Sequence, residues 1–176
     1  MGARAVFLVG FMGSGKTTVG QALARRLGWS FVDLDETIRR REGQSIPDIF
    51  RDHGEAAFRQ AETSALAALL TDLGRDSIVA LGGGAFAQEQ NRALLAGRPT
   101  VFLHAPVEEL WQRCSADKEI RPLRQDRAQF ARLHAERTPH YEKASLRVVT
   151  SGKEPPAIAA EIETLLRGDI HTGGSR

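Results

Sequence analysis

The sequence has little cysteine, tyrosine or lysine, and no long hydrophobic run. Cys114 is the only cysteine among 176 residues, so no disulfide can form within the chain, which is typical of a reducing cytosol. Apolar stretches such as 5–9 are far shorter than the roughly 18 residues that a membrane span needs. These absences exclude a disulfide scaffold and argue against a membrane protein. We expect a cytoplasmic protein in which Cys114 is a buried thiol without a chemical role.

A large excess of one charge is also absent. The 24 Lys and Arg residues exceed the 22 Asp and Glu residues by only two, and the arginines are scattered except at 39–41. A nucleic-acid surface would show a basic face interleaved with aromatic residues. We therefore expect neither a nucleic-acid nor a membrane partner. The length favours one domain that is large enough to fold without metal or disulfides.

Hydrophobic periodicity indicates strands that alternate with helices. Short apolar runs predict strands at 5–9, 30–32, 78–81, 100–104 and 146–149, and amphipathic stretches between them predict helices. The helices are expected at 16–27, 36–41, 55–70, 88–96, 107–114, 128–137 and 156–166. The residues at 45–48 look like the start of a helix before the one at 55–70. This alternation predicts an α/β fold of three layers, with a five-stranded, largely parallel sheet flanked by helices. We expect one domain over 1–167, a mobile lid at 115–127, and a disordered tail at 168–176.

The segment GFMGSGKT at 10–17 matches the phosphate-loop pattern G-x-x-x-x-G-K-[ST]. It follows a buried strand and opens an amphipathic helix, which is the context that the chemistry requires. The glycines let successive backbone N–H groups converge on phosphate oxygens at the N-terminus of the helix. Lys16 is expected to reach the β- and γ-phosphates of ATP, Thr17 to give its hydroxyl to Mg²⁺, and Thr18 to cap or pack.

The loop indicates a nucleotide but leaves the reaction open. A GTPase would need an Asn-Lys-x-Asp element, and the only asparagine, Asn91, is followed by Arg92. Transporter and helicase ATPases have longer cores with additional motifs. The remaining class is that of small kinases that phosphorylate metabolites or nucleotides.

Six motifs together resemble the shikimate kinase family. In chain order they are GFMGSGKTTVG, FVDLDE, FRQAE, LGGG, IRPL and ERTPHYE, and the resemblance runs from about 5 to 166. It implies a P-loop kinase that transfers a phosphoryl group from Mg·ATP to the 3-hydroxyl of shikimate, in the route to aromatic amino acids, and it suggests a monomer.

The resemblance assigns roles to two acidic residues, Asp33 at the metal and Asp35 at the acceptor. It implies that Asp33 assists Mg²⁺ through water, and that Asp35 holds the acceptor hydroxyl as a general base or only as a positioning group. The residues themselves predict that the two carboxylates alternate at the end of the second strand. Taken alone, Asp35 could equally cap the helix that follows.

The resemblance also implies a site for the shikimate carboxylate. Arg59, oriented by Glu62, and Arg137 would form a clamp, because each guanidinium offers parallel N–H donors. Without the resemblance, Arg59 and Glu62 could be a surface ion pair. The glycines after the third strand would let the substrate approach the backbone, and two phenylalanines would line the pocket or belong to the core; these residues are Gly82, Gly83, Gly84, Phe50 and Phe58.

Further residues are expected on the nucleotide side. Arg121 corresponds to the lid arginine of the family, although Arg124 stands where a leucine is usual, and alone it could be a solvated charge. Arg113 is expected to stack on adenine opposite a wall at 153–155. The full set expected to bind ATP is Gly10, Met12, Gly13, Ser14, Gly15, Lys16, Thr17, Thr18, Arg113, Arg121, Lys153 and Pro155. The histidines show no metal spacing.

Two alternatives remain. One is a small kinase that acts on gluconate or on a nucleoside monophosphate, which would need different acceptor contacts. The other is a non-catalytic, kinase-like module that binds an effector. Such a module would normally carry a DNA-binding segment, and the four residues before the first strand leave no room for one.

Overall fold

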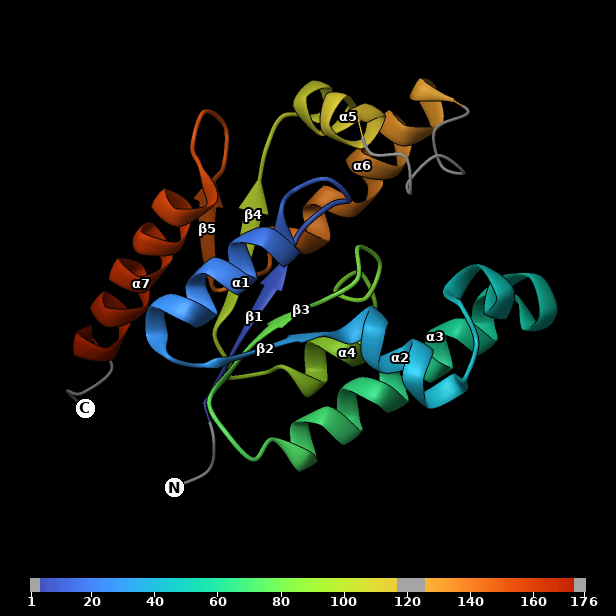
Figure 1. Cartoon of the computed structure of the whole chain (residues 1–176). Helices are drawn as coiled ribbons and strands as arrows, with labels where there is room; N and C mark the ends of the chain where they lie inside the picture. Colours follow the sequence, from blue (N-terminus) through green and yellow to red (C-terminus); the bar gives the residue numbers. More distant parts are fainter. Residues whose placement is uncertain (1–3, 117–125, 173–176) are drawn as a thin grey trace.

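The computed structural model describes residues 4–116 and 126–172, with side chains up to 168, as a sheet between helices (Figure 1). All described strand pairs are parallel, and the strand order is β2-β3-β1-β4-β5. The strands are β1 (Ala5–Val9), β2 (Ser30–Asp33), β3 (Ser77–Ala80), β4 (Thr100–His104) and β5 (Leu146–Val149). The helices are α1 (Lys16–Leu27), α2 (Leu34–Glu42), α3 (Ile46–Asp72), α4 (Glu89–Leu94), α5 (Val107–Ala116), α6 (Arg127–Tyr141) and α7 (Pro155–Thr172).

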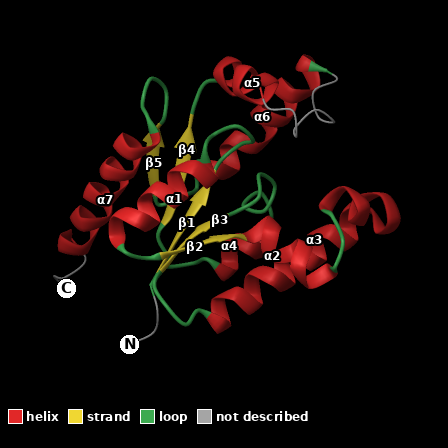
Figure 2. Cartoon of the chain, in the orientation of Figure 1, coloured by secondary structure: helices red, strands yellow, loops and turns green. Residues whose placement is uncertain are grey.

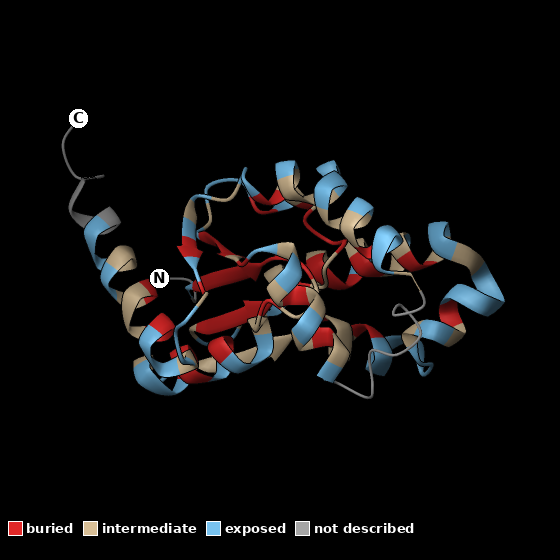
Figure 3. Ribbon diagram, turned by 90° about the horizontal axis from the view of Figure 1, so that it is seen from above, coloured by how far each residue is buried: buried red, intermediate tan, exposed pale blue. Residues whose placement is uncertain are grey.

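The central strand β1 shows why the sheet has helices on both faces. All five of its residues are buried, and successive side chains of a strand point to opposite faces. Phe7 and Val9 join a core with α2, α3, α5 and α6, whereas Val6 and Leu8 join a second core with α1 and α7. Figures 2 and 3 show these layers and the buried strands between them. The predicted three-layer α/β fold is therefore confirmed.

Local signals placed several helix ends correctly. Gly28, in the left-handed region at φ 68°, ends α1, and Gly43 ends α2 in the same way. Ser45 accepts a hydrogen bond from the backbone N–H of Asp48 at the start of α3, where Pro47 occupies the first turn. Gly54 has a non-helical backbone conformation within α3, and the helix is kinked there.

Helix α6 extends beyond its predicted end at residue 137. It continues through Pro139 to Tyr141, although proline cannot donate the usual helical hydrogen bond. Tyr141 is only 1% exposed, so the packing of its ring stabilises the last turn against this local preference. Helix α7 likewise includes 168–172, which we expected to be disordered, whereas 173–176 lie outside the described residues.

The structure describes only the two ends of the predicted lid at 115–127. Residues 115 and 116 complete α5, Asp126 caps α6 through the N–H groups of Ala128 and Gln129, and 117–125 lie outside the described residues. No helix in the described part of the chain is long and apolar enough to cross a membrane.

The buried strand yields a test of the fold. Replacing Leu8, which is fully buried, by alanine should lower the free energy of unfolding by about 2–5 kcal/mol because it leaves a cavity between the sheet and α1. The matched change Leu94→Ala, at a leucine that is 36% exposed, should cost less than about 1 kcal/mol. Urea denaturation of both variants measures the difference, and equal losses would contradict the assignment of Leu8 to the core.

Candidate functional site

The phosphate loop, residues 10–17, joins the end of β1 to the start of α1. Gly15 precedes the helix with φ 90° in the left-handed region, a conformation that side chains other than glycine rarely adopt. No side chain caps α1 and its first turn contains no acidic residue. The first N–H groups of this helix therefore remain available to an anion. The hydroxyl of Ser14 is buried and has no hydrogen-bond partner in the described chain, so it too can serve a ligand.

Lys16 lies across the phosphate loop. Its Nζ donates to the carbonyl oxygens of Gly10 at 2.7 Å and Phe11 at 3.1 Å. Burial lowers the pKa of this ammonium from 10.5 to about 8, although the carboxylates of Asp35 and Asp33 act in the opposite direction. A polyanion such as a triphosphate would supply the charge that the burial of Lys16 requires.

The acidic pair lies where β2 gives way to α2, but not as predicted. Asp33 ends the strand, whereas Asp35 belongs to the first turn of α2, so the two do not alternate along one strand. The cap of α2 is Asp33 rather than Asp35, because Asp33 Oδ1 accepts hydrogen bonds from the N–H groups of Asp35 and Glu36. The preference of a carboxylate for the N-terminus of a helix explains this change.

Asp35 is thereby free to face the sheet edge. A methyl group added at Gly82 would lie 2.6 Å from Asp35 Oδ1, so the carboxylate is in close contact with the glycine backbone. Burial, and then the nearby charge of Asp33, raise the pKa of Asp35, while Lys16 lowers it. A carboxylate with a raised pKa is a stronger base than a solvated one, which suits proton transfer from a hydroxyl.

The glycine loop, residues 82–84, brings two arginines from different helices together. A methyl group at Gly84 would lie 2.6 Å from Nη1 of Arg59, and one at Gly83 would lie 3.3 Å from Nη1 of Arg137. Any side chain at Gly84 would displace Arg59, so this approach requires glycine. The same position at Gly83 is 3.8 Å from the backbone nitrogen of Met12, so the glycine loop adjoins the phosphate loop.

A residue of the same helix, α3, holds the side chain of Arg59 in place. Its Nη1 donates to Glu62 Oε1 at 2.9 Å, and Glu62 is only 1% exposed, so the pair is not a surface ion pair. The Nε of Arg59 is buried without a hydrogen-bond partner in the described chain, at 3.7 Å from Glu55 Oε1. Burial raises the pKa of Glu62, while Arg59 and Arg137 lower it. Glu62 is therefore a buried counter-charge that pairs directly with Arg59.

The two phenylalanines of the predicted pocket lie in α3, one turn or more before Glu62. Phe58 is buried, and its ring lies under the guanidinium of Arg59 at 5.2 Å from the centroid. Phe50 is 37% exposed and stacks on Phe58 with centroids 4.7 Å apart. Phe58 thus belongs to the core while it supports Arg59, and Phe50 is the aromatic side chain accessible to a ligand.

The residues expected at the adenine surround the other end of the phosphate loop. Arg113, in α5, donates to the carbonyl of Gly13 at 3.2 Å and pairs with Glu109. Glu109 also accepts from Ser151, in the segment between β5 and α7 that carries Lys153, and Pro155 begins α7. Lys153 itself pairs with Glu161 at 2.6 Å.

The donor set near the phosphate loop fits a hard cation. The side chain of Thr17 is exposed at the start of α1, and the capping bonds of Asp33 use Oδ1, which leaves Oδ2 without a hydrogen bond from the described residues. Oxygen atoms of this kind suit Mg²⁺, which keeps several waters. Within the described ranges no group of three or more His, Cys, Asp or Glu residues could hold a metal by itself. Thr18 is exposed and forms no cap.

Some residues fall outside this constellation and others were missed. Arg121 and Arg124 lie outside the described residues. Sequence patterns assigned no role to Tyr141, whose hydroxyl donates to the carbonyl of Gly83. They also missed Asn91 and Arg92, which bind carbonyls of the segment after the glycine loop. The only sequence signal was that Tyr141 lies inside ERTPHYE.

Comparison with known proteins gives consistent results. The model of the family described as shikimate kinase matches residues 12–167. A shikimate kinase from Persephonella marina is 39% identical over 160 residues, which are 90% of this chain and 96% of the relative. One from Moorella thermoacetica is 42% identical over 165 residues, or 92% and 94% of the two chains.

Solved structures agree. The structure of a shikimate kinase from Acinetobacter baumannii in complex with shikimate superposes with a TM-score of 0.86 at 36% identity, covering 95% of this chain and 94% of the other. A gluconokinase from Sinorhizobium meliloti has a TM-score of 0.63 at 20% identity and covers 98% of each chain, which shows a common fold alone.

The lowered pKa of Lys16 makes nucleotide binding dependent on pH. Below about pH 8 the ammonium is charged, and above it the free protein must take up a proton to bind phosphate, so ATP affinity should fall by up to about tenfold per pH unit. Isothermal titration calorimetry between about pH 7 and 9.5 measures this decline. The Lys16→Met variant should bind more weakly and with no such decline; parallel profiles would refute the role of Lys16.

Proposed function

Because the chain belongs to the shikimate kinase family, we propose that it transfers the γ-phosphoryl group of ATP to the 3-hydroxyl of shikimate, releasing ADP and shikimate 3-phosphate. The observation that carries this proposal is the glycine loop, where Asp35, Arg59 and Arg137 meet beside the phosphate loop. We infer that these residues supply a base, a carboxylate clamp and a triphosphate site at the carboxyl ends of the strands, where ligands bind in open α/β folds.

The phosphoryl donor is bound by backbone and charge. The N–H groups of the phosphate loop and of the uncapped N-terminus of α1 donate to the β- and γ-phosphates, and Lys16 exchanges its two carbonyl contacts for phosphate oxygens. Arg113 and the segment at 153–155 hold the adenine end. Ser14 and Met12 contribute to the loop that surrounds the phosphates.

The acceptor is oriented through its carboxylate, which lies away from the hydroxyl that reacts. Parallel N–H donors of Arg59 and Arg137 bind the planar carboxylate of shikimate, which directs the ring toward Asp35. Asp35 accepts a hydrogen bond from the 3-hydroxyl and takes its proton as the oxygen attacks phosphorus, while the γ-phosphorus–oxygen bond to ADP breaks. The catalytic effect comes from this alignment and from the buried charges around the transferred group.

A magnesium ion fits the donor set described above. Thr17 would hold it directly, and Asp33 would hold it through water. When bound, it neutralises charge on the β- and γ-phosphates. We assign Arg121 as the further cation at the transferred phosphoryl group, and we infer a monomeric, cytoplasmic enzyme.

A direct test compares acceptors. A coupled assay of ADP release with shikimate, gluconate and AMP should show turnover with shikimate and at least about 100-fold lower kcat/KM with the other two, because neither matches the clamp and the base together. A higher kcat/KM with gluconate or AMP than with shikimate would overturn the assignment of shikimate as the substrate. No turnover with any acceptor, despite ATP binding, would favour a non-catalytic module.

The carboxylate clamp generates a second prediction. Arg59→Lys keeps the charge but loses the parallel donors, which costs roughly 1.5 to 3 kcal/mol and should raise the KM for shikimate about 10- to 150-fold. The matched experiment uses a shikimate analogue in which a neutral hydroxymethyl group replaces the carboxylate. The wild type should discriminate strongly between the two compounds and the variant much less. Equal discrimination by both proteins would leave Arg137 as the only group that binds the carboxylate.

A further inference from the structure

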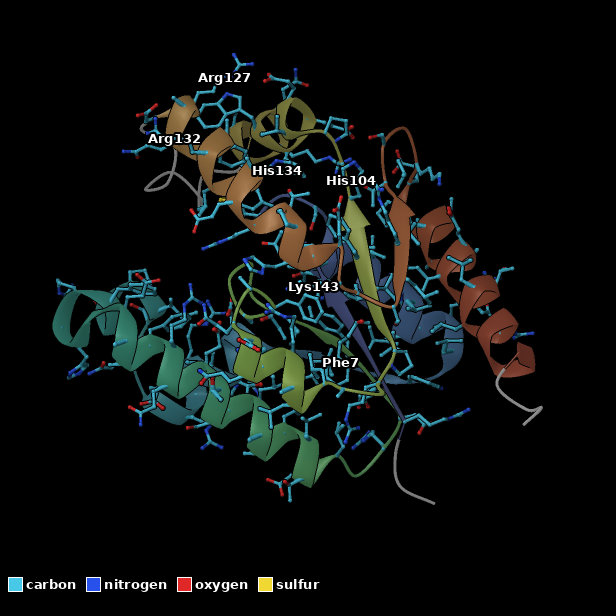
Figure 4. The ribbon with its side chains drawn as sticks, turned by 180° about the vertical axis from the view of Figure 1, so that it is seen from behind. Phe7, His104, Arg127, Arg132, His134 and Lys143 are labelled. Carbon is cyan, nitrogen blue, oxygen red and sulfur yellow. The ribbon has the colours of Figure 1, made fainter. Side chains whose placement is uncertain are left out.

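Tyr141, the only tyrosine of the chain, ends α6 beneath the glycine loop. Its side chain is 1% exposed, and its ring packs against Phe102 of β4 with centroids 5.4 Å apart. The hydroxyl donates to the carbonyl of Gly83, and the guanidinium of Arg137, one turn earlier in α6, lies beside the same glycine. One buried hydroxyl therefore contacts the glycine loop at the point where half of the clamp lies. Figure 4, which views the molecule from behind, shows α6 with His134 labelled on it.

This hydroxyl is a reliable donor. Burial raises the pKa of Tyr141 to about 12, so the phenol stays protonated across the physiological range. Its proton goes to Gly83, and its lone pairs then remain for the Arg137 guanidinium. The contact has the same polarity at every pH at which the protein works.

The carbonyl contact also sets the direction of an amide hydrogen. The described chain contains no cis peptide bond, and in a trans peptide the carbonyl oxygen and the next N–H point in opposite directions. Since the carbonyl of Gly83 faces Tyr141, the N–H of Gly84 points away from it. In the described part of the chain, the N–H groups of Gly83 and Gly84 have no protein acceptor. They are available to a ligand.

Other side chains hold only the next part of this segment. Asn91 donates to the carbonyl of Ala85 at 2.9 Å, and Arg92 donates to the carbonyls of Phe86 and Ala87 at 2.7 and 2.8 Å. Among these contacts, the one from Tyr141 is the one that reaches the glycine loop itself.

We propose that Tyr141 is a positioning residue of the acceptor site, whose hydroxyl orients the peptide between Gly83 and Gly84 and holds the Arg137 guanidinium toward the acceptor carboxylate. This inference rests on the proposed function for the identity of the acceptor. The orientation of the loop and of Arg137 does not depend on that identity.

The test deletes one oxygen. Tyr141→Phe retains the ring that packs on Phe102, and it should raise the KM for shikimate about three- to tenfold with kcat and the KM for ATP changed by less than about twofold. Because Arg137 is no longer held, the preference for shikimate over the neutral hydroxymethyl analogue should fall by a similar factor. A KM that rises equally for both compounds would mean that Tyr141 serves packing alone, and an unchanged KM would also overturn the proposal.

The matched control deletes a buried hydroxyl elsewhere. Thr100, at the opposite end of β4, accepts a hydrogen bond from the N–H of Ser145 at 2.9 Å and is 5% exposed. Thr100→Val should lower the melting temperature without changing any of the three kinetic constants. Comparison of the two variants separates positioning from a general loss of stability.

A ligand-free measurement distinguishes this proposal from the proposed function. In ¹⁵N–¹H NMR spectra of the unliganded protein, Tyr141→Phe should shift the amide signals of Gly83 and Gly84 and the Nε–H signal of Arg137, whereas Thr100→Val should leave them in place. Unshifted signals would refute the role of Tyr141 whatever the substrate is. If the signals shift but the protein does not phosphorylate shikimate, the proposed function is refuted and the positioning role of Tyr141 stands.

Discussion

Close approach of side chains to a bare backbone is the constraint on which the site depends. At Gly82 and Gly84 the carboxylate of Asp35 and the guanidinium of Arg59 occupy the space that a β-carbon would fill. Side chains from α2 and α3 can meet in the loop after β3 only because the glycines there carry no side chain. The parallel sheet supplies the other half of the arrangement, since the carboxyl ends of all its strands open on the same edge.

Burial of charge follows from this crowding. Lys16 loses hydration and its pKa falls, while Asp35 and Glu62 lose hydration and their pKa values rise. Each group partly compensates another, because Asp35 faces Lys16 and Glu62 faces Arg59. Under the proposed function, a triphosphate at Lys16 and a carboxylate at the two arginines would complete the set. Desolvation of the free site would then favour the binding of charged ligands.

The polar groups behind the site have nearly all their hydrogen bonds within the protein, which keeps the loops in one conformation. Asn91 is fully buried and joins α3 to the segment after the glycine loop, because it accepts from Thr63 and donates to Ala85. The buried side-chain atoms that lack partners in the described chain are Ser14 Oγ, Arg59 Nε and His104 Nδ1. Two of these three atoms lie at the candidate site, so unmet bonding capacity is concentrated there.

Local pattern determined the layers, most helix ends and the phosphate loop, because β-strand alternation, glycine caps and G-x-x-x-x-G-K-[ST] act over a few residues. Residue types also indicated Asp35 and Arg59 as candidates, but no spacing along the chain brings them together. Tertiary structure decided that α6 continues through Pro139 to Tyr141, whose side chain is buried. It also brought α2, α3 and α6 to one glycine backbone. The physical reason is that these outcomes depend on burial and on contacts between distant segments, which local propensity does not contain.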